Sequence, residues 1–239
     1  MTYQSDLFAG KRVLVTGGTR GIGAAVANHM AELGAEVLAT ARNTSCTEVS
    51  SKVTVVAMDV SQPQAVESVF AGLDRLDVVV NCAGAIQRGK EHELDAFEQV
   101  VGINLTGTMR ICAAARPLLA NSGGVIVNMA SMLSYFGGPL VPAYSASKGA
   151  VAQLTKSLAI AYAAEGIRVN AVAPGWIATQ FTQGVQDDPA RNQAILDRTP
   201  MGRWGTPDDI AKVVVFLCTE AAGFVTGAII PVDGGYLTV

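Results

Sequence analysis

Three residues within positions 131–148 have the types and spacing needed for proton transfer: Ser131, Tyr144 and Lys148. Tyr144 and Lys148 are four positions apart, so a helix would present both side chains on one face. A phenol with an ordinary pKa of about 10 exchanges protons poorly at neutral pH, but a nearby ammonium group stabilises its anion. Ser131 ends an apolar, strand-like run, where its hydroxyl could hold a carbonyl oxygen beside the phenol. The stretch therefore predicts a general acid/base site, although a tyrosine and lysine at this spacing also fit an ordinary surface helix.

The composition favours one globular domain with a large core. The chain has 239 residues, of which 50% are hydrophobic and 15% charged. Its net charge of −3 gives no basic surface for nucleic acid. We expect no signal peptide, and no apolar run approaches the roughly 20 residues that a membrane span requires. These features predict a cytoplasmic protein.

The histidines and cysteines argue against two other kinds of site. There are only two histidines, which weighs against a Ser-His-Asp hydrolase and against a histidine-based metal site. The four cysteines have no C-x-x-C or metal-ligand spacing, so they are expected to be reduced thiols. We predict no metal centre.

A glycine-rich segment, GGTRGIG at 17–23, directly follows an apolar run at 11–16. Apolar residues then recur at helical spacing, at Ile22, Val26, Met30 and Leu33. A strand, a glycine loop and a helix in this order form the context of a dinucleotide-binding site, because the loop lets the backbone approach a pyrophosphate. The glycine spacing is G-x-x-x-G-x-G. The alternative is a glycine-rich turn that binds nothing.

The residue after the second predicted strand, 36–41, bears on the choice of cofactor. Arg42 stands there in place of the carboxylate that would bind the ribose 2′-hydroxyl of NAD. Arg20 lies in the glycine loop. Two guanidinium groups facing one 2′-phosphate favour NADP(H) over NAD(H), while either arginine alone could be a solvated surface charge.

Strands and helices alternate along the rest of the chain. Further strands are expected at 53–58, 77–81, 125–130, 168–173 and 228–232. Helices are expected at 64–73, 94–115 and 210–217 and around Tyr144, with at most a turn or two in the short segment 43–52. Asn104 lies inside one of these helices, where asparagine is unfavourable unless it has a polar role. The alternation predicts one α/β domain over 1–239, a doubly wound, Rossmann-type parallel sheet of about seven strands with helices on both faces.

Several motifs together resemble the short-chain dehydrogenase/reductase family. They are TGGTRGIG at 16–23, Asp59-Val60, NCAG at 81–84, Asn104, Ser131, YSASK at 144–148 and PGWIAT at 174–179. The resemblance runs from about Lys11 to the C-terminus. Each motif alone is weak, but their order and spacing together are specific. One departure is Cys82, which stands where the family usually has a second asparagine.

The resemblance implies a role for each matching residue. Ser131 would bind the substrate oxygen, Tyr144 would transfer the proton and Lys148 would hold the cofactor ribose. Asn104 would position a water that relays protons. The remaining cofactor contacts implied are Thr16, Gly17, Thr19, Arg20, Gly21, Ile22 and Gly23 on the pyrophosphate side, Asp59 and Val60 at the adenine, Asn81, Ala83 and Gly84 at the nicotinamide ribose, and Pro174, Ile177 and Thr179 at the carboxamide.

The substrate region is expected in a lid at 176–205, with Asp187-Asp188-Pro189 as a break between short helices. Leu133, Trp176 and Phe181 could form apolar walls or belong to the core. Gln87-Arg88, with the segments SMLSYFGG and ILDRTPMGRWG, is similar to the sugar-acid dehydrogenases of the family. Arg88 could bind a substrate carboxylate or simply face solvent.

The leading interpretation is an NADP(H)-dependent oxidoreductase that acts on a secondary alcohol or ketone of a small polar substrate, such as a sugar acid, polyol or keto acid. One alternative is a 3-oxoacyl-acyl-carrier-protein reductase, which would need a basic docking patch that the sequence does not show. Another is a non-catalytic NADP-binding sensor or scaffold. The family resemblance also implies a homotetramer, formed through the long central helices and the C-terminal strand.

Overall fold

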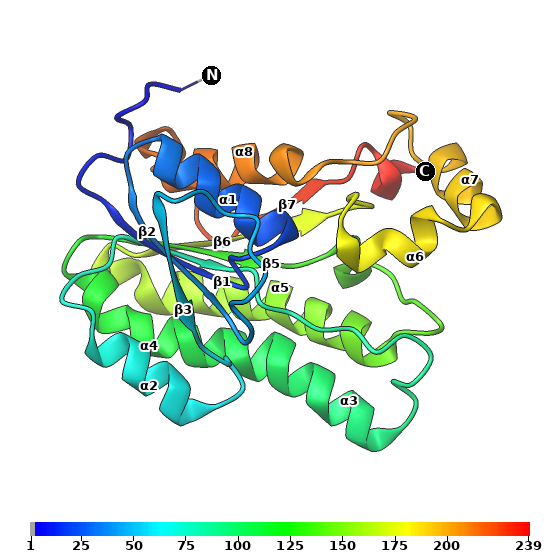
Figure 1. Cartoon of the computed structure of the whole chain (residues 1–239), viewed down its shortest axis with the longest axis horizontal. Coiled ribbons are helices and arrows are strands. Elements are labelled where there is room, and N and C mark those ends of the chain that lie inside the picture. Colours follow the sequence, from blue (N-terminus) through cyan, green and yellow to red (C-terminus); the bar gives the residue numbers. More distant parts are fainter. Residues whose placement is uncertain (1–2) are drawn as a thin grey trace.

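Seven strands form one sheet, and every neighbouring pair in it is parallel (Figure 1). The computed structural model describes residues 3–239. The strand order is β3-β2-β1-β4-β5-β6-β7. Successive strands are added on one side of β1 up to β3 and on its other side from β4 onward, while all of them stay parallel. The strands are β1 Arg12–Thr16, β2 Glu36–Ala41, β3 Val53–Ala57, β4 Val78–Asn81, β5 Val125–Met129, β6 Arg168–Pro174 and β7 Ile229–Val232. The predicted doubly wound, Rossmann-type fold is confirmed.

Helices cover both faces of this sheet, and Figure 1 shows α1 and α8 on one side with α2 to α5 on the other. The helices are α1 Gly21–Glu32, α2 Pro63–Ala71, α3 Leu94–Val101, α4 Thr108–Ala120, α5 Pro142–Tyr162, α6 Gln183–Gln186, α7 Pro189–Asp197 and α8 Pro207–Cys218. Within residues 3–239, none of them is both long and apolar enough to cross a bilayer.

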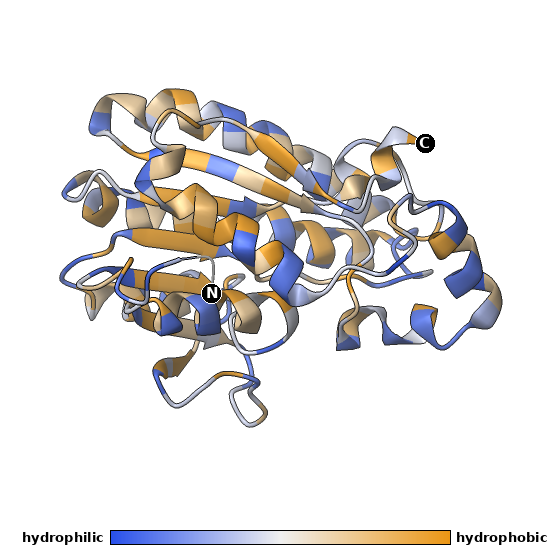
Figure 2. Cartoon of the chain, turned by 90° about the horizontal axis from the view of Figure 1, so that it is seen from above, coloured by the Kyte–Doolittle hydropathy of each residue, from blue (hydrophilic) through white to orange (hydrophobic). Residues whose placement is uncertain are grey.

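The central strands are mostly apolar because both faces of the sheet are buried. In β1, Val13 and Val15 pack into the core beneath α1 and α8, while Leu14 points into the opposite core with α4 and α5. This alternation follows from the two-residue period of a strand. Hydropathy colouring shows the apolar strands enclosed between helices with mixed surfaces (Figure 2).

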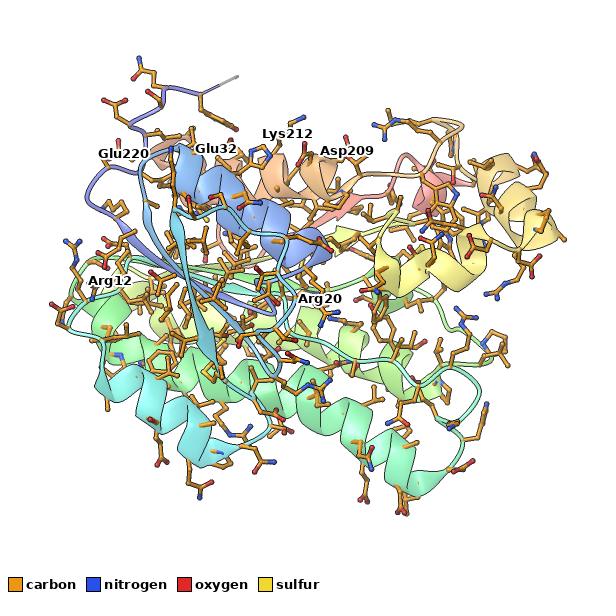
Figure 3. The ribbon with its side chains drawn as sticks, viewed as in Figure 1. Arg12, Arg20, Glu32, Asp209, Lys212 and Glu220 are labelled. Carbon is orange, nitrogen blue, oxygen red and sulfur yellow. The ribbon has the colours of Figure 1, made fainter. Side chains whose placement is uncertain are left out.

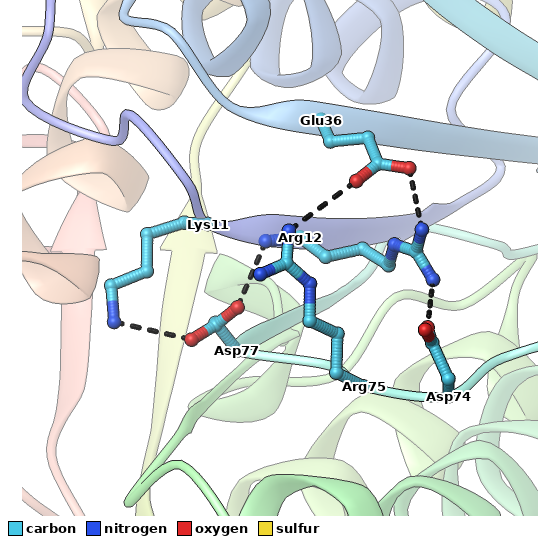
Figure 4. Close-up of polar contacts among 6 residues, drawn as sticks. All are labelled: Lys11, Arg12, Glu36, Asp74, Arg75 and Asp77. Carbon is cyan, nitrogen blue, oxygen red and sulfur yellow. Dashed lines mark hydrogen bonds and ion pairs between the residues drawn. The ribbon is translucent and has the colours of Figure 1, made fainter.

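Charged residues gather at the edge of the sheet where β1 and β2 begin (Figure 4). Arg12 bonds to Glu36 on β2 at 2.7 Å and also to Asp74. Asp77 accepts bonds from the Arg12 backbone N–H at 2.9 Å and from Lys11 at 3.1 Å. This network joins the strand starts, so the opposite edge, where the parallel strands end, remains for the functional groups.

The helix predicted at 94–115 differs from the structure in its middle. The chain is α-helical at Leu94–Val101, widens into a π-helix at Gly102–Gly107 and returns to α-helix at Thr108–Ala120. Single-turn π segments inside α-helices are frequent at functional sites, and Asn104 lies within this one. The segment 43–52 contains no helix, as expected.

Candidate active site

The glycine loop between β1 and α1 needs glycine for two physical reasons. Gly17 and Gly21 have φ angles of 61° and 54°, which side chains disfavour. A Cβ at Gly17 would lie 2.7 Å from the Ala83 nitrogen, and a Cβ at Gly23 would lie 2.2 Å from the Gly17 oxygen. The loop is therefore packed tightly between the start of α1 and the turn after β4.

The first turn of α1 fits the pyrophosphate of a dinucleotide. Its N-cap residue, Arg20, makes no side-chain capping bond, and the turn contains no acidic residue, which leaves backbone N–H groups and the positive end of the helix dipole for an anion. The Gly21 N–H is the exception, because it donates to the Glu48 carboxylate at 2.7 Å. Thr16, which is buried, closes the loop by accepting a bond from the Ala83 N–H at 3.3 Å.

Arg20 and Arg42 are both exposed near this loop (Figure 3 labels Arg20). Arg20 donates to the Gln180 side chain in the lid at 3.3 Å, so the glycine loop and the lid are in contact. Arg42 follows β2 directly and forms no ion pair with residues 3–239. Both guanidinium groups are therefore exposed, and neither is held in an ion pair with residues 3–239.

Ser131, Tyr144 and Lys148 come together where β5 ends. Ser131 is buried and begins the 3₁₀ turn Met132–Ser134, where its hydroxyl accepts from the Leu133 N–H at 3.1 Å. Tyr144 and Lys148 lie in the first two turns of α5, and the Lys148 ammonium is 5.5 Å from the centre of the Tyr144 ring. Lys148 Nζ also donates to the Met129 carbonyl at 2.7 Å. One helix and one strand end thus hold the predicted triad.

Burial shifts the pKa values of Tyr144 and Lys148 in opposite directions. Burial raises the pKa of Tyr144 to about 12, with Glu91 adding to the rise and a hydrogen bond with Ser131 opposing it. Burial also lowers the pKa of Lys148 to about 8. Burial is therefore the largest influence on the pKa of Tyr144 in the cofactor-free protein, and the role of Lys148 in lowering that pKa stays a prediction.

Asn104 is 1% exposed, and both polar atoms of its side-chain amide form hydrogen bonds within the protein. Its Oδ1 accepts from the Ala85 N–H at 2.8 Å, and its Nδ2 donates to the Ala85 carbonyl and to Ser147 Oγ, each at 3.0 Å. The π-helix thus fastens the turn after β4 to α5. A Cβ on Gly84 would lie 3.4 Å from Asn104 Oδ1 and 3.9 Å from Lys148 Nζ, so these three residues adjoin.

The other predicted cofactor residues fall into two groups. Asn81 is buried and its side chain donates to Asn128 at 2.9 Å, so the ribose contact predicted for Asn81 would come from its backbone. The rest lie around the ends of the strands: Thr19, Ile22, Asp59, Val60, Ala83, Gly84, Pro174, Ile177 and Thr179. Within this set, the Thr179 methyl group would lie 3.4 Å from a Cβ at Gly21, so the start of the lid touches the glycine loop.

The two ends of the lid lie side by side, since Ile177 and Gly205 pair as an isolated bridge. Asp188 caps α7 by accepting from the N–H groups of Ala190 and Arg191, which confirms the predicted break between short helices. Phe181 lies beside the catalytic tyrosine, with the two ring centres 6.4 Å apart.

Leu133, Trp176 and Arg88 lie in different surroundings. Leu133 is half-buried just after Ser131. Trp176 is half-buried, packs edge-on against Trp204 with the ring centres 5.6 Å apart, and lines a cavity together with Ile177 and Met201. Arg88 is exposed in the loop after β4.

Sequence reasoning missed several residues that hold this site together, namely Glu48, Glu91, Ser147 and Gln180. Ser147 is within the YSASK motif, and its position three residues after Tyr144 was a usable signal. The other three lie in loops or in the lid, and their partners are up to 160 positions away in the sequence. No local pattern indicates such contacts.

Comparison with known proteins agrees with this geometry. The family profile described as enoyl-(acyl carrier protein) reductase matches residues 17–237. The 2-dehydro-3-deoxy-D-gluconate 5-dehydrogenase of Bacillus subtilis (strain 168) is 42% identical, and the alignment covers 100% of both chains. The cis-4-hydroxycyclohexanecarboxylate dehydrogenase of Sinomonas cyclohexanicum is 40% identical over 98% of this chain and 99% of its own.

A solved structure matches over the same extent. It is a putative 2-deoxy-D-gluconate 3-dehydrogenase from Agrobacterium tumefaciens with bound NADP, 39% identical, with a TM-score of 0.89 over 99% of this chain and 100% of that one. The predicted resemblance is confirmed. A match of this extent, in a chain whose glycine loop and catalytic helix meet at one edge of the sheet, makes the protein a member of the short-chain dehydrogenase/reductase family, an NAD(P)-dependent dehydrogenase that acts on CH–OH groups.

Proposed function

We propose that this dehydrogenase interconverts a secondary alcohol and a ketone on a small polar substrate, with NADP(H) as the preferred cofactor. Of the predicted sugar acids, polyols and keto acids, we favour those that carry a carboxylate. The nicotinamide supplies or accepts the hydride when it is bound. The protein must then hold the substrate oxygen, exchange its proton and recognise the carboxylate.

Ser131 and Tyr144 are the groups assigned to the substrate oxygen. The Ser131 hydroxyl and the Tyr144 phenol converge at the end of β5, so both can bond to one oxygen atom. Tyr144 donates its proton to a ketone oxygen during reduction and takes it back from the alcohol during oxidation. Lys148 places a positive charge beside the phenol, and Phe181 covers the ring from the lid side.

The substrate class rests on the charge around Arg88. Although Arg88 is exposed overall, partial burial of its guanidinium lowers its pKa, and the nearby guanidinium group of Arg191 on the lid helix α7 lowers it further. Neither arginine forms an ion pair with residues 3–239. Glu91 opposes this lowering, but its oxygens bond to backbone N–H groups and to neither arginine. Two nearby cations without an ion-pair partner among residues 3–239 favour an anionic ligand between the β4 loop and the lid.

The relatives support the same chemistry. One is named for a dehydrogenated gluconate, and the other for a cyclohexane that bears both a hydroxyl and a carboxylate. Both names describe an alcohol and a carboxylate in one small molecule. We extend that combination to this chain.

The test is oxidation, with NADP⁺, of substrates that differ at one terminal carbon, such as gluconate with its carboxylate and glucitol with a neutral hydroxymethyl group. Arg88→Ala should raise KM for the carboxylate substrate at least tenfold, about 1.4 kcal/mol or more, and leave the neutral one unchanged. Lys90→Ala is the matched control, since Lys90 is an exposed cation in the same loop. Equal KM changes for both substrates would contradict the carboxylate assignment. Faster turnover of acetoacetyl thioesters than of keto acids would instead favour a 3-oxoacyl-acyl-carrier-protein reductase.

The NADP preference rests on Arg20 and Arg42, which stand on the adenosine side of the glycine loop. Fluorescence titration with NADPH and NADH in parallel tests it. We expect tighter NADPH binding that Arg42→Ala abolishes, because a 2′-phosphate loses its charged partner. Equal binding of both cofactors would refute this role.

We also infer that the enzyme is a homotetramer, because large apolar side chains remain exposed on α5 and after α8. A reducing cytoplasmic environment is consistent with the cysteines, all four of which are free thiols.

A further inference from the structure

Glu91 is a carboxylate buried beside the catalytic tyrosine. It is 1% exposed and is one of the largest fully buried side chains in the described chain. Acidic side chains are almost never this buried unless their oxygens are bonded. Glu91 lies in the loop after β4, between Arg88 and α5, so its bonding partners show how this loop is attached to the helix.

Both carboxylate oxygens of Glu91 accept bonds from backbone N–H groups. Oε2 accepts from the Tyr144 N–H at 2.8 Å, and Oε1 accepts from the Gln87 N–H at 2.8 Å. Helix α5 has no cap of its own, since Val141 at the N-cap makes no side-chain bond and the first turn contains no acid. Glu91 therefore caps the catalytic helix from another part of the chain, where the helix dipole favours a negative charge.

The loop that carries Glu91 is itself fastened to the segment before α5. The Gly89 N–H donates to the Leu140 carbonyl at 2.8 Å, and the His92 ring bonds to the Pro139 carbonyl at 2.9 Å. Glu91 also acts electrostatically on both neighbours: it raises the pKa of Tyr144 and counteracts the lowering of the pKa of Arg88. One side chain thus links the loop that we assign to the substrate carboxylate with the residue that moves the proton.

We propose that Glu91 is a positioning residue, which holds Tyr144 in place by capping the catalytic helix and couples it to the substrate loop that begins at Gln87. The inference rests on the proposed function, because it takes Tyr144 as the proton donor. The charged and polar groups that face the Tyr144 phenol are Lys148 from α5, Ser131 from the end of β5 and Glu91 from the β4 loop. Removing the charge of Glu91 leaves the Lys148 ammonium and the Ser131 hydroxyl in place beside the phenol.

Three variants separate charge from shape. Glu91→Gln keeps the shape and removes the charge, whereas Glu91→Asp keeps the charge and shortens the reach. Glu93→Gln is the matched control, because Glu93 is exposed two residues away. Titration of ¹³Cζ-labelled tyrosine by NMR, with Tyr144 assigned by its loss in Tyr144→Phe, reports the phenol without any substrate.

We expect Tyr144 to titrate at lower pH in Glu91→Gln, and kcat to fall at least tenfold while cofactor affinity changes less than threefold. Glu91→Asp should keep the wild-type titration but lose kcat, and Glu93→Gln should match the wild type. A Glu91→Gln enzyme with wild-type kcat and wild-type titration would overturn the proposal. If no substrate turns over, the proposed function fails, and the titration still decides the role of Glu91.

A measurement on the unmodified protein covers the case in which the variants do not fold. The Tyr144 and Gln87 amides should be protected from hydrogen exchange, even though Tyr144 lies in the first helical turn, where amides are usually unpaired. Exchange of both amides at the rate of exposed loop amides would overturn the proposal independently.

Discussion

Tyr144 and Lys148 are neighbours whose pKa values burial shifts in opposite directions, to about 12 and about 8. A buried phenol retains its proton, while a buried amine tends to lose its own. At neutral pH the protein therefore holds a protonated tyrosine beside a lysine that is still mostly charged. This state can donate a proton to a ketone at once, whereas alcohol oxidation needs the phenolate. We therefore expect oxidation rates to rise with pH through the alkaline range and reduction rates to remain level near neutrality.

Replacing Tyr144 with phenylalanine tests the assigned proton donor. The ring, its contact with Phe181 and the backbone bond to Glu91 all remain, and only the hydroxyl is lost. We expect turnover to fall by at least 10²-fold, the usual contribution of a general acid or base, with unchanged NADPH affinity. Steady-state kinetics and fluorescence titration measure the two quantities. Retention of most of the activity would mean that another group transfers the proton.

Lys148 should reduce the stability of the cofactor-free protein. Its pKa falls from 10.5 to about 8 on folding, so below pH 8 the native state holds a charge that burial disfavours. Between pH 8 and 10.5 the unfolded state binds more protons, so this penalty is relieved as pH rises. Lys148→Met should therefore raise the free energy of unfolding at pH 7 by up to about 3 kcal/mol, less the lost bond to Met129, and the gain should shrink towards pH 10.

Urea unfolding at pH 7 and pH 10 measures this effect. Lys156→Met is the control, since Lys156 is an exposed lysine on the same helix. Loss of stability in Lys148→Met at pH 7 would show that the lysine stabilises the fold despite its burial.

At the scale of elements, the sequence predicted the parts that depend on local pattern. Each strand is an apolar run bounded by polar or glycine residues, and the catalytic spacing of Tyr144 and Lys148 is a property of one helix. The π-helix around Asn104 could not be predicted, because it depends on bonds to Ala85 and Ser147 from other elements. The core position of the Asn81 side chain was missed for the same reason, since its partner Asn128 lies on the next strand.

The loop between β2 and β3 replaces a crossover helix and is held by α1. Asn28 donates to the Glu48 carbonyl at 3.1 Å and accepts from the Ser50 N–H at 2.8 Å. Asn28→Ala removes both bonds, so we expect a loss of about 1 kcal/mol in the free energy of unfolding and faster proteolysis within 43–52. Urea unfolding and limited proteolysis measure these changes, with Glu32→Ala on the same helix as the control. Wild-type proteolysis in Asn28→Ala would mean that other contacts hold the loop.

Across the whole molecule, the ion pairs that join the strands and the residues of the active site lie at opposite edges of the sheet. The ion-pair network of Arg12, Glu36 and Asp74 joins the strand starts (Figure 4), while Ser131 and the glycine loop follow strand ends. The network is largely exposed, so each pair contributes little by itself and salt weakens it. Changes there should affect unfolding more than turnover.

The surface also carries apolar side chains that a monomer would leave in water. Ile160 on α5 is 81% exposed, and Phe224, just after α8, is fully exposed. Covering a large apolar side chain stabilises an assembly by roughly 1.5–3 kcal/mol. We infer that each residue belongs to its own contact surface between copies of the chain, since two surfaces of twofold symmetry give a tetramer.

Substitution of each residue by aspartate tests this arrangement, because a charge in an apolar contact disfavours association. We expect the wild-type chain to be a tetramer by light scattering after size-exclusion chromatography. Ile160→Asp and Phe224→Asp should each give dimers, and the double variant should give monomers. Leu7→Asp is the control, since Leu7 is also exposed, at 39%, but lies in the N-terminal turn. A monomeric wild-type protein would refute the tetramer, and tetramers in both single variants would place the interfaces elsewhere.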